Sequence, residues 1–579
     1  MTKFEFKPKL VETLRDYNRQ QLSADIMAGI IVGIVALPLA IAFGIASGVT
    51  PEKGIITAIV AGLIVSLLGG SKVQIGGPTG AFIIIIYGII QQYGFEGLTI
   101  ATLMAGVFLI MFGVLHLGTI IKYIPYPIVV GFTSGIALTI FTTQVKDLLG
   151  LQMDVVPTDF IEKWIAYAGV LSTIDWWSAA VGLGSVALIA LWPRLTTLCD
   201  NGLMQVLRRL PGSLIAIIVM TVAALLLKEH GGVTSIETIG DRFSISNVLP
   251  EASVPVLTWE TIKGLVSPAI TIAILGAIES LLSATVADGV IGDRHSSNTE
   301  LIAQGVANLA TPLFGGIPAT GAIARTMTNI NNGGRTPIAG VIHAAVLLLI
   351  FLFLMPLAQY IPMACLAGVL VIVSYNMSGW RSFKSILKNP KSDIIVLWVT
   401  FLLTVIFDLT IAIEVGLICA CLLFMRRMAE TTDVKIISQE IDPNEEDSDF
   451  QMGNLEHLTI PDDVEVYEIN GPYFFGAGNR FEEIMGALGH RRPKVRIIRM
   501  RKVPFVDSTG LHNLQNLCLM SQREGITVVL SGVTASVNET LHRAGFDTML
   551  GRENICSHIN VALERARELT QSGRAERRA

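Results

Sequence analysis

The chain has 579 residues, of which 51% are hydrophobic and only 15% are charged. Soluble domains carry roughly 25% charged residues, so this composition excludes a wholly soluble protein. The formal net charge of −5 gives no basis for nucleic-acid binding. The six cysteines show no CxxC spacing, and Cys419 and Cys421 lie inside an apolar run. We therefore expect no disulfide, no bound metal and no cofactor.

A polar lead over residues 1–22, too charged for a signal peptide, precedes a long series of apolar segments. Segments of this kind and length predict membrane-spanning helices. We predict fourteen of them, at residues 24–48, 53–70, 73–91, 97–117, 120–142, 176–192, 212–227, 264–287, 299–314, 319–330, 337–357, 360–375, 393–408 and 409–425.

Loop charges predict how these spans are oriented. With a cytoplasmic N-terminus, Arg and Lys gather in the inner loops, whereas the long outer loops 143–175 and 228–263 are net acidic. This is the positive-inside bias. An even number of spans places both termini in the cytoplasm, so residues 23–427 are predicted to form a multi-pass transport domain.

Two apolar segments are interrupted by Gly and Pro in the same way, "LLGGSKVQIGGPTGAF" at 67–82 and "LFGGIPATGAIARTMTNINN" at 313–332. Pro38 precedes Thr79 by 41 residues, and Glu279 precedes Thr320 by the same number. A matched pair of interrupted spans in two halves of a chain is typical of a transporter with internal repeats. Seven spans per repeat, an odd number, require the repeats to be inverted.

The composition changes after the last span. Residues 428–455 include the acidic stretch "EIDPNEEDSDFQM" and are predicted to form a linker. Alternating strand and helix patterns follow, with strands at 494–500 and 526–532 and helices at 508–524, 535–545 and 559–570. This alternation predicts a small α/β domain over residues 456–570, followed by a tail at 571–579.

The interrupted spans are candidate anion-binding elements. Pro78 and Pro318 each precede a short helix, and a helix that begins within the membrane presents unpaired N–H groups and a positive dipole end. Gly and Pro are also common in membrane helices without any binding role. If the two repeats cross, the residues that would surround an anion are Thr79, Gly80, Ala81, Ala319, Thr320 and Gly321.

Two charged residues lie where the membrane makes charge costly. Arg325 follows the second interruption, and Glu279 lies in the apolar segment "TIAILGAIESLLSATVAD". Arg325 is predicted to add positive charge to the pocket; the alternative is a side chain that reaches the cytoplasmic surface. Glu279, with Ser283 one turn later, is predicted to couple a proton to the anion. The alternative for Glu279 is a structural partner of Arg325 or of the backbone.

Leu39 and Phe43 follow Pro38 at one-turn spacing, which suits either a cavity lining or ordinary helix packing. Asp25 lies near the start of the first predicted span, where we expect an interfacial position. No cluster of metal ligands and no nucleophile–base pair is recognisable in the sequence. We therefore expect a protein that is not an enzyme.

Several of these stretches together resemble the SulP family of anion transporters, which includes prestin and pendrin in animals. The stretches are "IVALPLAIAFGIASGV", "GGPTGAF", "ILGAIESLLSATVADG", "HSSNTELIAQGVANL" and "GGIPATGAIARTMTNI". "VPFVDSTGLHNL" resembles the signature of a STAS domain. Within the family, "AIESLL", "NMSGWRSF" and "FMRRMAETT" are most similar to the bacterial C4-dicarboxylic acid transporter.

The resemblance implies the uracil-transporter-like fold of seven plus seven inverted spans. A core (spans 1–4 and 8–11) would move against a gate (spans 5–7 and 12–14) as an elevator. It also implies a homodimer in a bacterial cytoplasmic membrane and leaves room for a regulatory protein bound to the STAS domain. The family's coupling acid corresponds to Glu279, and its substrate pocket to Leu39, Phe43, Thr79, Gly80, Ala81, Thr320, Gly321 and Arg325.

Two departures from the family pattern bear on function. Leu39 stands where prestin-like members have a glutamine, so one polar anion contact is missing. Glu279 and Ser283 stand where the sodium-coupled bicarbonate branch has an aspartate and a threonine. The longer acid would fill the space of a cation, which favours protons over sodium.

In STAS relatives that are controlled by kinases, the serine of "DSTG" is phosphorylated, and here that residue is Ser508. A phosphate at a helix N-terminus is well accommodated. The simpler interpretation, which we favour for a transporter tail, is a serine that caps the helix.

The sequence as a whole predicts proton-coupled symport of sulfate or a C4-dicarboxylate. The alternatives are a sodium-coupled bicarbonate transporter of the same family and a membrane-tethered signalling scaffold whose STAS domain binds a regulator.

Overall fold

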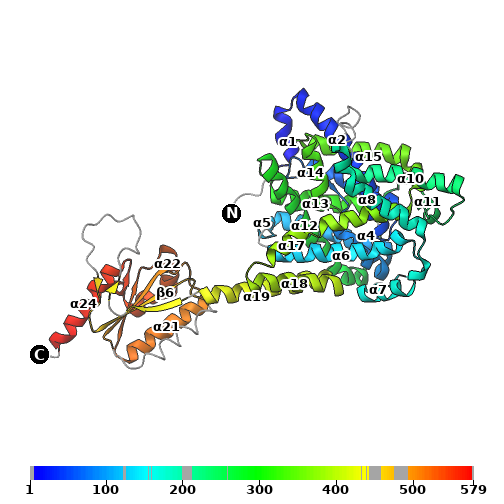
Figure 1. Ribbon diagram of the computed structural model, residues 1–579. Helices are drawn as coiled ribbons and strands as arrows, with labels where there is room; N and C mark the ends of the chain where they lie inside the picture. Colours follow the sequence, from blue (N-terminus) through cyan, green and yellow to red (C-terminus); the bar gives the residue numbers. More distant parts are fainter. Residues whose placement is uncertain are drawn as a thin grey trace. The chain divides into compact units, whose positions relative to one another are not determined.

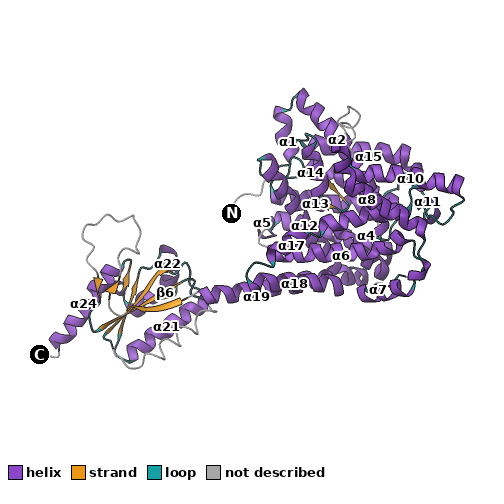
Figure 2. Ribbon diagram, viewed as in Figure 1, coloured by secondary structure: helices purple, strands orange, loops and turns teal. Residues whose placement is uncertain are grey.

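The computed structural model describes residues 6–121, 125–153, 156–157, 159–198, 211–253, 255–256, 258–407, 409–431, 433–437, 440–441, 458–474 and 493–576. These form two compact units, residues 1–420 and 421–579 (Figure 1). The first unit is almost entirely helical, and the second combines helices with a sheet (Figure 2).

In the described part of the chain, nine helical segments are long and apolar enough to cross a membrane. They are Arg19–Ala46 (α2), Pro51–Leu68 (α3), Gly80–Val114 (η2 with α4, Ile83–Val114), Tyr126–Leu149 (α6), Trp176–Thr196 (within α8, Trp176–Leu198), Gly212–His230 (within α10, Gly212–Gly231), Trp259–Ile291 (α12), Pro337–Tyr360 (α15, Pro337–Leu354, with η4) and Met363–Ile386 (α16, Met363–Met377, with α17, Trp380–Ile386).

The predicted count of fourteen spans remains a prediction. Two expected spans are joined in α4, which has a non-helical kink at Gly94 (φ +68°). Three other expected spans are shorter helices, α13 (Ser297–Leu313), α14 (Ile323–Asn331) and α18 (Lys391–Ile406). The last is α19 (Leu409–Thr431).

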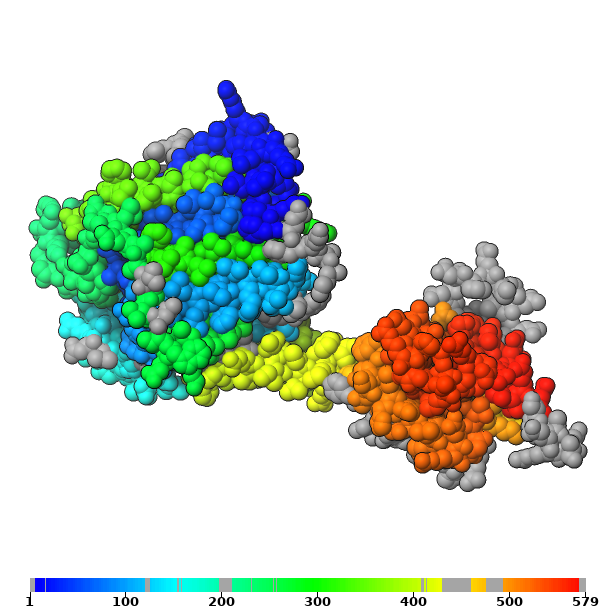
Figure 3. Space-filling model, turned by 180° about the vertical axis from the view of Figure 1, so that it is seen from behind, coloured from blue at the N-terminus to red at the C-terminus, as the bar shows by residue number. Residues whose placement is uncertain are grey.

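The helices of the first unit pack in two groups. In one group α2, α3, α4, α12, α13, α14 and α15 contact one another, and in the other α6, α8, α10, α16 and α18 do so. Figure 3 shows the green surface near residue 300 between the blue of α3 and the light blue of α4, because α13 packs against both. The early and late parts of the chain are therefore interleaved.

Small residues allow the closest helix contacts, as is usual in membranes. A Cβ atom at Gly305 of α13 would lie 2.7 Å from the carbonyl oxygen of Gly106 on α4. A Cβ atom at Gly106 would lie 2.8 Å from the carbonyl oxygen of Gly305. The α4–α13 contact is thus built on two facing glycines.

We expect Gly305→Ala to destabilise the protein, because its methyl group would meet backbone that cannot move aside. Overpacking of this kind costs about 1–3 kcal/mol. Thermal unfolding in detergent measures the effect. Gly289→Ala is the matched control, because this helical glycine of α12 has nothing within 4 Å of an added Cβ. Equal unfolding temperatures for the two variants would contradict the prediction.

The second unit contains a five-stranded sheet in the order β3-β6-β7-β8-β9. Its strands are Asp433–Ile437, Val464–Asn470, Val495–Lys502, Thr527–Ser531 and Ile555–Cys556. The pairing of β3 with β6 is antiparallel and the others are parallel. The strand β3 lies inside the stretch predicted to be a linker. A further antiparallel pair joins β4 (Glu440–Ile441), in the same stretch, to β5 (Leu458–Thr459).

Hydrophobic residues on the two faces of this sheet pack against different helices. On one face they pack against α21 (Ser508–Arg523), α22 (Ala535–Arg543) and α23 (Phe546–Leu550), and on the other against α24 (Ile559–Glu576). The helices that the sequence predicts over residues 508–524, 535–545 and 559–570 are confirmed, with α24 extending further.

Cys518 of α21 lies in the first of these two packed clusters, and burial raises its pKa to about 12. We expect N-ethylmaleimide at pH 8 to leave Cys518 unlabelled in the folded protein and to label it after denaturation, as peptide mass spectrometry would show. The unfolded thiol ionises near pH 9. The unfolding free energy should therefore fall as pH rises above 9. Rapid labelling of the folded protein would contradict this expectation.

Candidate functional site

The two interrupted segments meet inside the helical unit. Residues Gly76–Gly77 form β1 and Thr320–Gly321 form β2, and they pair antiparallel with Gly76 opposite Gly321 and Gly77 opposite Thr320. Figure 2 shows this short orange pair among the purple helices. The N–H of Ala322 also donates to the carbonyl of Ile75 at 2.9 Å. Glycine at three of the four paired positions allows the two backbones to approach closely.

A cavity of about 450 Å³ lies beside this pair, within the usual size range of small-molecule sites. We call it the central cavity. One wall comes from the helix group of α2, α12 and α14, and the other from α6 and α16, through residues such as Thr133 and Asn376. Of the residues predicted to form a site, those that line it are Leu39, Phe43, Thr79, Gly80, Glu279, Gly321 and Arg325.

Four predicted site residues lie behind the cavity wall. Ala81 and Ala319 are fully buried. The hydroxyl of Thr320 donates to the carbonyl of Gly276 at 2.8 Å. The hydroxyl of Ser283 donates to Thr326 Oγ1 at 3.3 Å. Thr320 and Ser283 therefore bond to the protein instead of facing the cavity beside Glu279.

Glu279 and Thr79 are joined across the cavity lining. The Thr79 hydroxyl donates to Glu279 Oε2 at 2.8 Å. No ion pair links Glu279 to Arg325 among the described residues, although both line the same cavity. The acid from α12 is thus coupled to the first interrupted segment and not to the nearby cation.

Arg325 lies in the first turn of α14 and is 1% exposed. Its Nη2 donates to the carbonyl of Pro78 at 2.9 Å, so it binds the segment from the other half of the chain. Its Nη1 is buried without a hydrogen-bond partner. This cation lies beside the N-terminus of α14, where Ala322 provides no side-chain cap. The N–H groups of the first turn, the helix dipole and the guanidinium together favour an anion in the cavity.

Gly77 fixes where this guanidinium lies. Its φ is +153°, and an added Cβ would overlap Arg325 Nη1. We expect Gly77→Ala to displace Arg325 and to weaken anion binding at least about tenfold, since charged contacts depend strongly on distance. Isothermal titration of the purified protein measures this loss. Gly292→Ala is the control, because Gly292 also has a positive φ (+70°) but open space around it. Unchanged affinity in Gly77→Ala would rule out this role for Gly77.

Sequence reasoning missed the fully buried carboxylate of Glu300 on α13. Its Oε2 accepts from the N–H groups of Gly70 (2.8 Å) and Ser71 (3.2 Å). Its Oε1 accepts from Gln74 Nε2 (3.0 Å), Ser280 Oγ (3.2 Å) and Gln304 Nε2 (2.9 Å). Glu300 therefore ties the first interrupted segment to α12 and α13. Its place in the first turn of α13 makes it resemble an ordinary helix-start acid in the sequence.

Asp25, which the sequence predicts to lie at the membrane interface, is fully buried within the protein near the start of α2. Its carboxylate accepts from the hydroxyl groups of Tyr17 (3.0 Å) and Thr336 (2.6 Å) and from the N–H of Arg335 (3.0 Å). It thus joins α2 to the N-terminus of α15. A charged residue at the very start of a span is the only signal of this role in the sequence.

Ser508, the candidate regulatory residue, is the exposed first residue of α21. The capping residue is Asp507, whose side chain accepts from the N–H of Gly510 at 2.7 Å. The expectation that Ser508 itself caps the helix is therefore wrong, because the preceding acid occupies the capping position.

Comparison with known proteins identifies the family of this chain. Residues 22–400 match the model of the sulfate permease family, and residues 457–562 match that of the STAS domain. The chain is 40% identical to "Putative sulfate transporter YvdB" of Bacillus subtilis (strain 168) over 547 residues, which cover 94% of this chain and 98% of that protein.

Two further likenesses extend this finding. The chain is 30% identical to the bicarbonate transporter BicA of a Picosynechococcus species over 450 residues, 76% of each protein. A solved structure of SLC26A9 has the same fold, with a TM-score of 0.85 at 17% identity, and the match covers 98% of this chain and 93% of that one. The chain therefore belongs to the sulfate permease family and carries a C-terminal STAS domain.

Proposed function

We propose that this protein is a secondary transporter that couples the entry of a proton to the entry of a divalent anion. The observation that carries the proposal is the central cavity, where Glu279 and Arg325 lie together without forming an ion pair. A cation and a helix N-terminus suit an anion, and a separate carboxyl group suits a proton.

The hydrogen bond between Thr79 and Glu279 offers a way to couple the two. An ionised Glu279 accepts a hydrogen bond from the Thr79 hydroxyl group, and the two oxygens are 2.8 Å apart. A protonated Glu279 can donate to Thr79 instead, because a protonated carboxyl group gains a donor. The Thr79 proton is then free to point to an anion at Arg325. Proton binding and anion binding would thereby reinforce each other.

Sulfate is the anion we favour, because YvdB, which matches this chain over nearly its full length, is named for it. A C4-dicarboxylate also fits a cavity of about 450 Å³, and the resemblance of "AIESLL" and "NMSGWRSF" supports it. Coupling to a proton is useful for either anion, since the membrane potential opposes each entering negative charge by about 2.3 kcal/mol per 100 mV.

We further propose fourteen spans as seven plus seven inverted repeats, with both termini in the cytoplasm of a bacterial cell. The two helix groups described above would serve as core and gate and move as an elevator. The contacts between the groups are sparse, made by α2 with α10 and α16 and by α4 and η2 with α6, which suits relative motion. A homodimer is proposed on family grounds.

Sodium-coupled bicarbonate transport is the second candidate, favoured by the likeness to BicA. A sodium site would need several oxygen ligands near Glu279. The Ser283 hydroxyl is instead bonded to Thr326, which weighs against this candidate. A signalling scaffold would not need a cavity that combines an acid, a cation and a helix N-terminus.

Uptake of labelled sulfate, succinate and bicarbonate into proteoliposomes tests these candidates. Each anion is supplied with an inward proton gradient, an inward sodium gradient or neither. Proton-driven sulfate uptake supports the proposal, sodium-driven bicarbonate uptake supports the second candidate, and no uptake under any condition supports the scaffold.

A further inference from the structure

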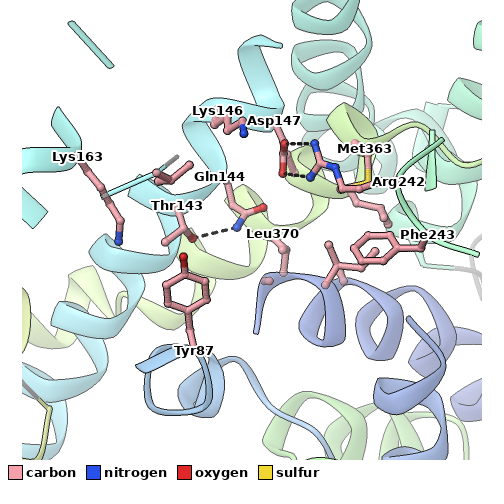
Figure 4. A pocket seen from close by; sticks show the side chains of 16 residues that line it. Tyr87, Thr143, Gln144, Lys146, Asp147, Lys163, Arg242, Phe243, Met363 and Leu370 are labelled. Carbon is pink, nitrogen blue, oxygen red and sulfur yellow. Dashed lines mark hydrogen bonds and ion pairs between the residues drawn. The ribbon is translucent and has the colours of Figure 1, made fainter. Parts of the chain in front are cut away.

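A second cavity, of about 180 Å³, lies between the same two groups of helices (Figure 4). Its lining includes three basic side chains, Lys146 of α6, Lys163 of α7 (Phe160–Gly169) and Arg242 of α11 (Ile239–Arg242). Asp147 of α6 is the single acidic side chain in the lining. We call this space the basic cavity.

The basic cavity and the central cavity lie at two levels of one interface. On α6, Thr133 is the last residue that lines the central cavity, and Thr143 is the first that lines the basic cavity. At 1.5 Å per residue, these positions are about 15 Å apart. The buried side chains of Ile136 and Ile140 lie between these two positions. The loops of the basic cavity are those predicted to lie outside the cell.

Positive charge dominates the basic cavity. Arg242 binds two carboxylates, that of Asp147 (Nη2 to Oδ1 at 2.9 Å, Nη1 to Oδ2 at 3.3 Å) and that of Glu237 (Nε to Oε1 at 3.2 Å). These charges balance locally, so the excess positive charge comes from the two lysines. Lys146 donates one of its three protons to the carbonyl of Met153 at 3.0 Å. Lys163 is 5% exposed. In Figure 4, Lys163 lies on one side of the cavity and Arg242 with Asp147 on the other.

The lining of the cavity is rich in basic side chains, although the loops that contribute to it are net acidic. Three acids in these loops serve as helix caps. Asp159 accepts from two N–H groups at the start of α7, Asp241 takes part in a capping box on α11, and Asp175 accepts from the N–H of Ser178 at 2.9 Å. These three acids thus serve local structure, whereas both lysines of the 143–175 loop line one cavity.

We propose that the basic cavity is an anion-acceptor site, which binds a small divalent oxyanion on its way to or from the central cavity. Cations in a cleft with low-dielectric walls concentrate anions and raise their association rate. The volume suffices for one such ion with a few waters, each of which takes about 30 Å³ in the liquid. Only the identity of the solute rests on the proposed function; the selection of anions by charge does not.

The first test is sided transport of labelled sulfate. In Lys146→Met and Lys163→Met, the half-saturating concentration on the side of α7 should rise about tenfold, since electrostatic steering of this size is common. Half-saturation from the opposite side should not change, and Lys163→Arg should restore the wild-type value. Lys228→Met, at an exposed lysine of α10, is the control. Equal changes on both sides, or none on either side, would overturn the proposal.

The second test needs no transport. A single cysteine is introduced at Thr143, which lines the basic cavity, with the native cysteines replaced. Its reaction rates with an anionic and a cationic methanethiosulfonate reagent are compared. The anionic reagent should react faster, and Lys146→Met with Lys163→Met should lower the ratio about tenfold. A cysteine at exposed Val248 is the reference. A ratio unchanged by the lysine substitutions refutes the acceptor site, even if sulfate is transported. If the lysine substitutions lower the ratio in a protein that takes up no sulfate, the acceptor site is supported and only the proposed identity of the solute is excluded.

Discussion

Glu279→Gln should abolish the dependence of anion uptake on an inward proton gradient. Glutamine keeps the size of the side chain and an acceptor for the Thr79 hydroxyl, which lies 2.8 Å from Glu279 Oε2, but it takes up no proton. For each proton no longer carried, the driving force falls by about 2.3 kcal/mol at 100 mV, roughly 40-fold in the accumulation ratio. Uptake of labelled sulfate in proteoliposomes at fixed potential measures this loss.

Glu414→Gln is the matched control, because it removes an exposed acid of α19 that does not line the central cavity. This variant should keep the wild-type response to the gradient. Exchange of internal for external sulfate should survive in Glu279→Gln, since the cation and the helix N-terminus remain. Sulfate uptake that still follows the proton gradient in Glu279→Gln would exclude this acid as the carrier of the proton.

Glu300→Ala should unfold or severely destabilise the helical unit. The change removes an acceptor from five buried donors, those of Gly70, Ser71, Gln74, Ser280 and Gln304. Of these, Gln74 keeps Ser280 as a second acceptor. A buried donor that loses its partner costs about 1–3 kcal/mol, so a total loss of more than about 3 kcal/mol is expected. Thermal unfolding in detergent provides the measurement.

The same change should disturb the site before the protein unfolds. Gln74 packs closely against Gly321 of β2, and Glu300 is one of the groups that hold Gln74 in place. We therefore expect sulfate affinity to fall at temperatures where Glu300→Ala is still folded. Glu260→Ala, at an exposed first-turn acid of α12, should change neither property. A Glu300→Ala protein with wild-type unfolding temperature and affinity would show that this network has no structural role.

The sequence predicted the meeting of the two interrupted segments because a span broken by Gly and Pro cannot satisfy its backbone groups alone and needs a partner within the membrane. It did not predict which side chains face the cavity. Thr320 and Ser283 have the right spacing, yet both bond to neighbouring groups, because the rotation of each helix depends on the packing of distant segments. Glu300 was missed for a related reason, since its donors come from residues about 230 positions earlier as well as from nearby ones.

The basic cavity is a second feature that the sequence did not predict. A net count of charges in the 143–175 and 228–263 loops indicates an acidic surface, and the count is right for each loop as a whole. Only the fold separates the acids that cap helices from the lysines that line a common space. Charge totals therefore predict orientation in the membrane better than they predict local potential.

The pairing of β1 with β2 also bears on how the protein is made. Gly76 and its partner Gly321 are separated by more than half of the first unit, so a ribosome completes the first strand long before the second exists. Until then the early strand lacks the backbone partner that a bilayer interior demands. We infer that the candidate site assembles late during biosynthesis, and that neither half of the transport domain, expressed alone, would contain it in complete form.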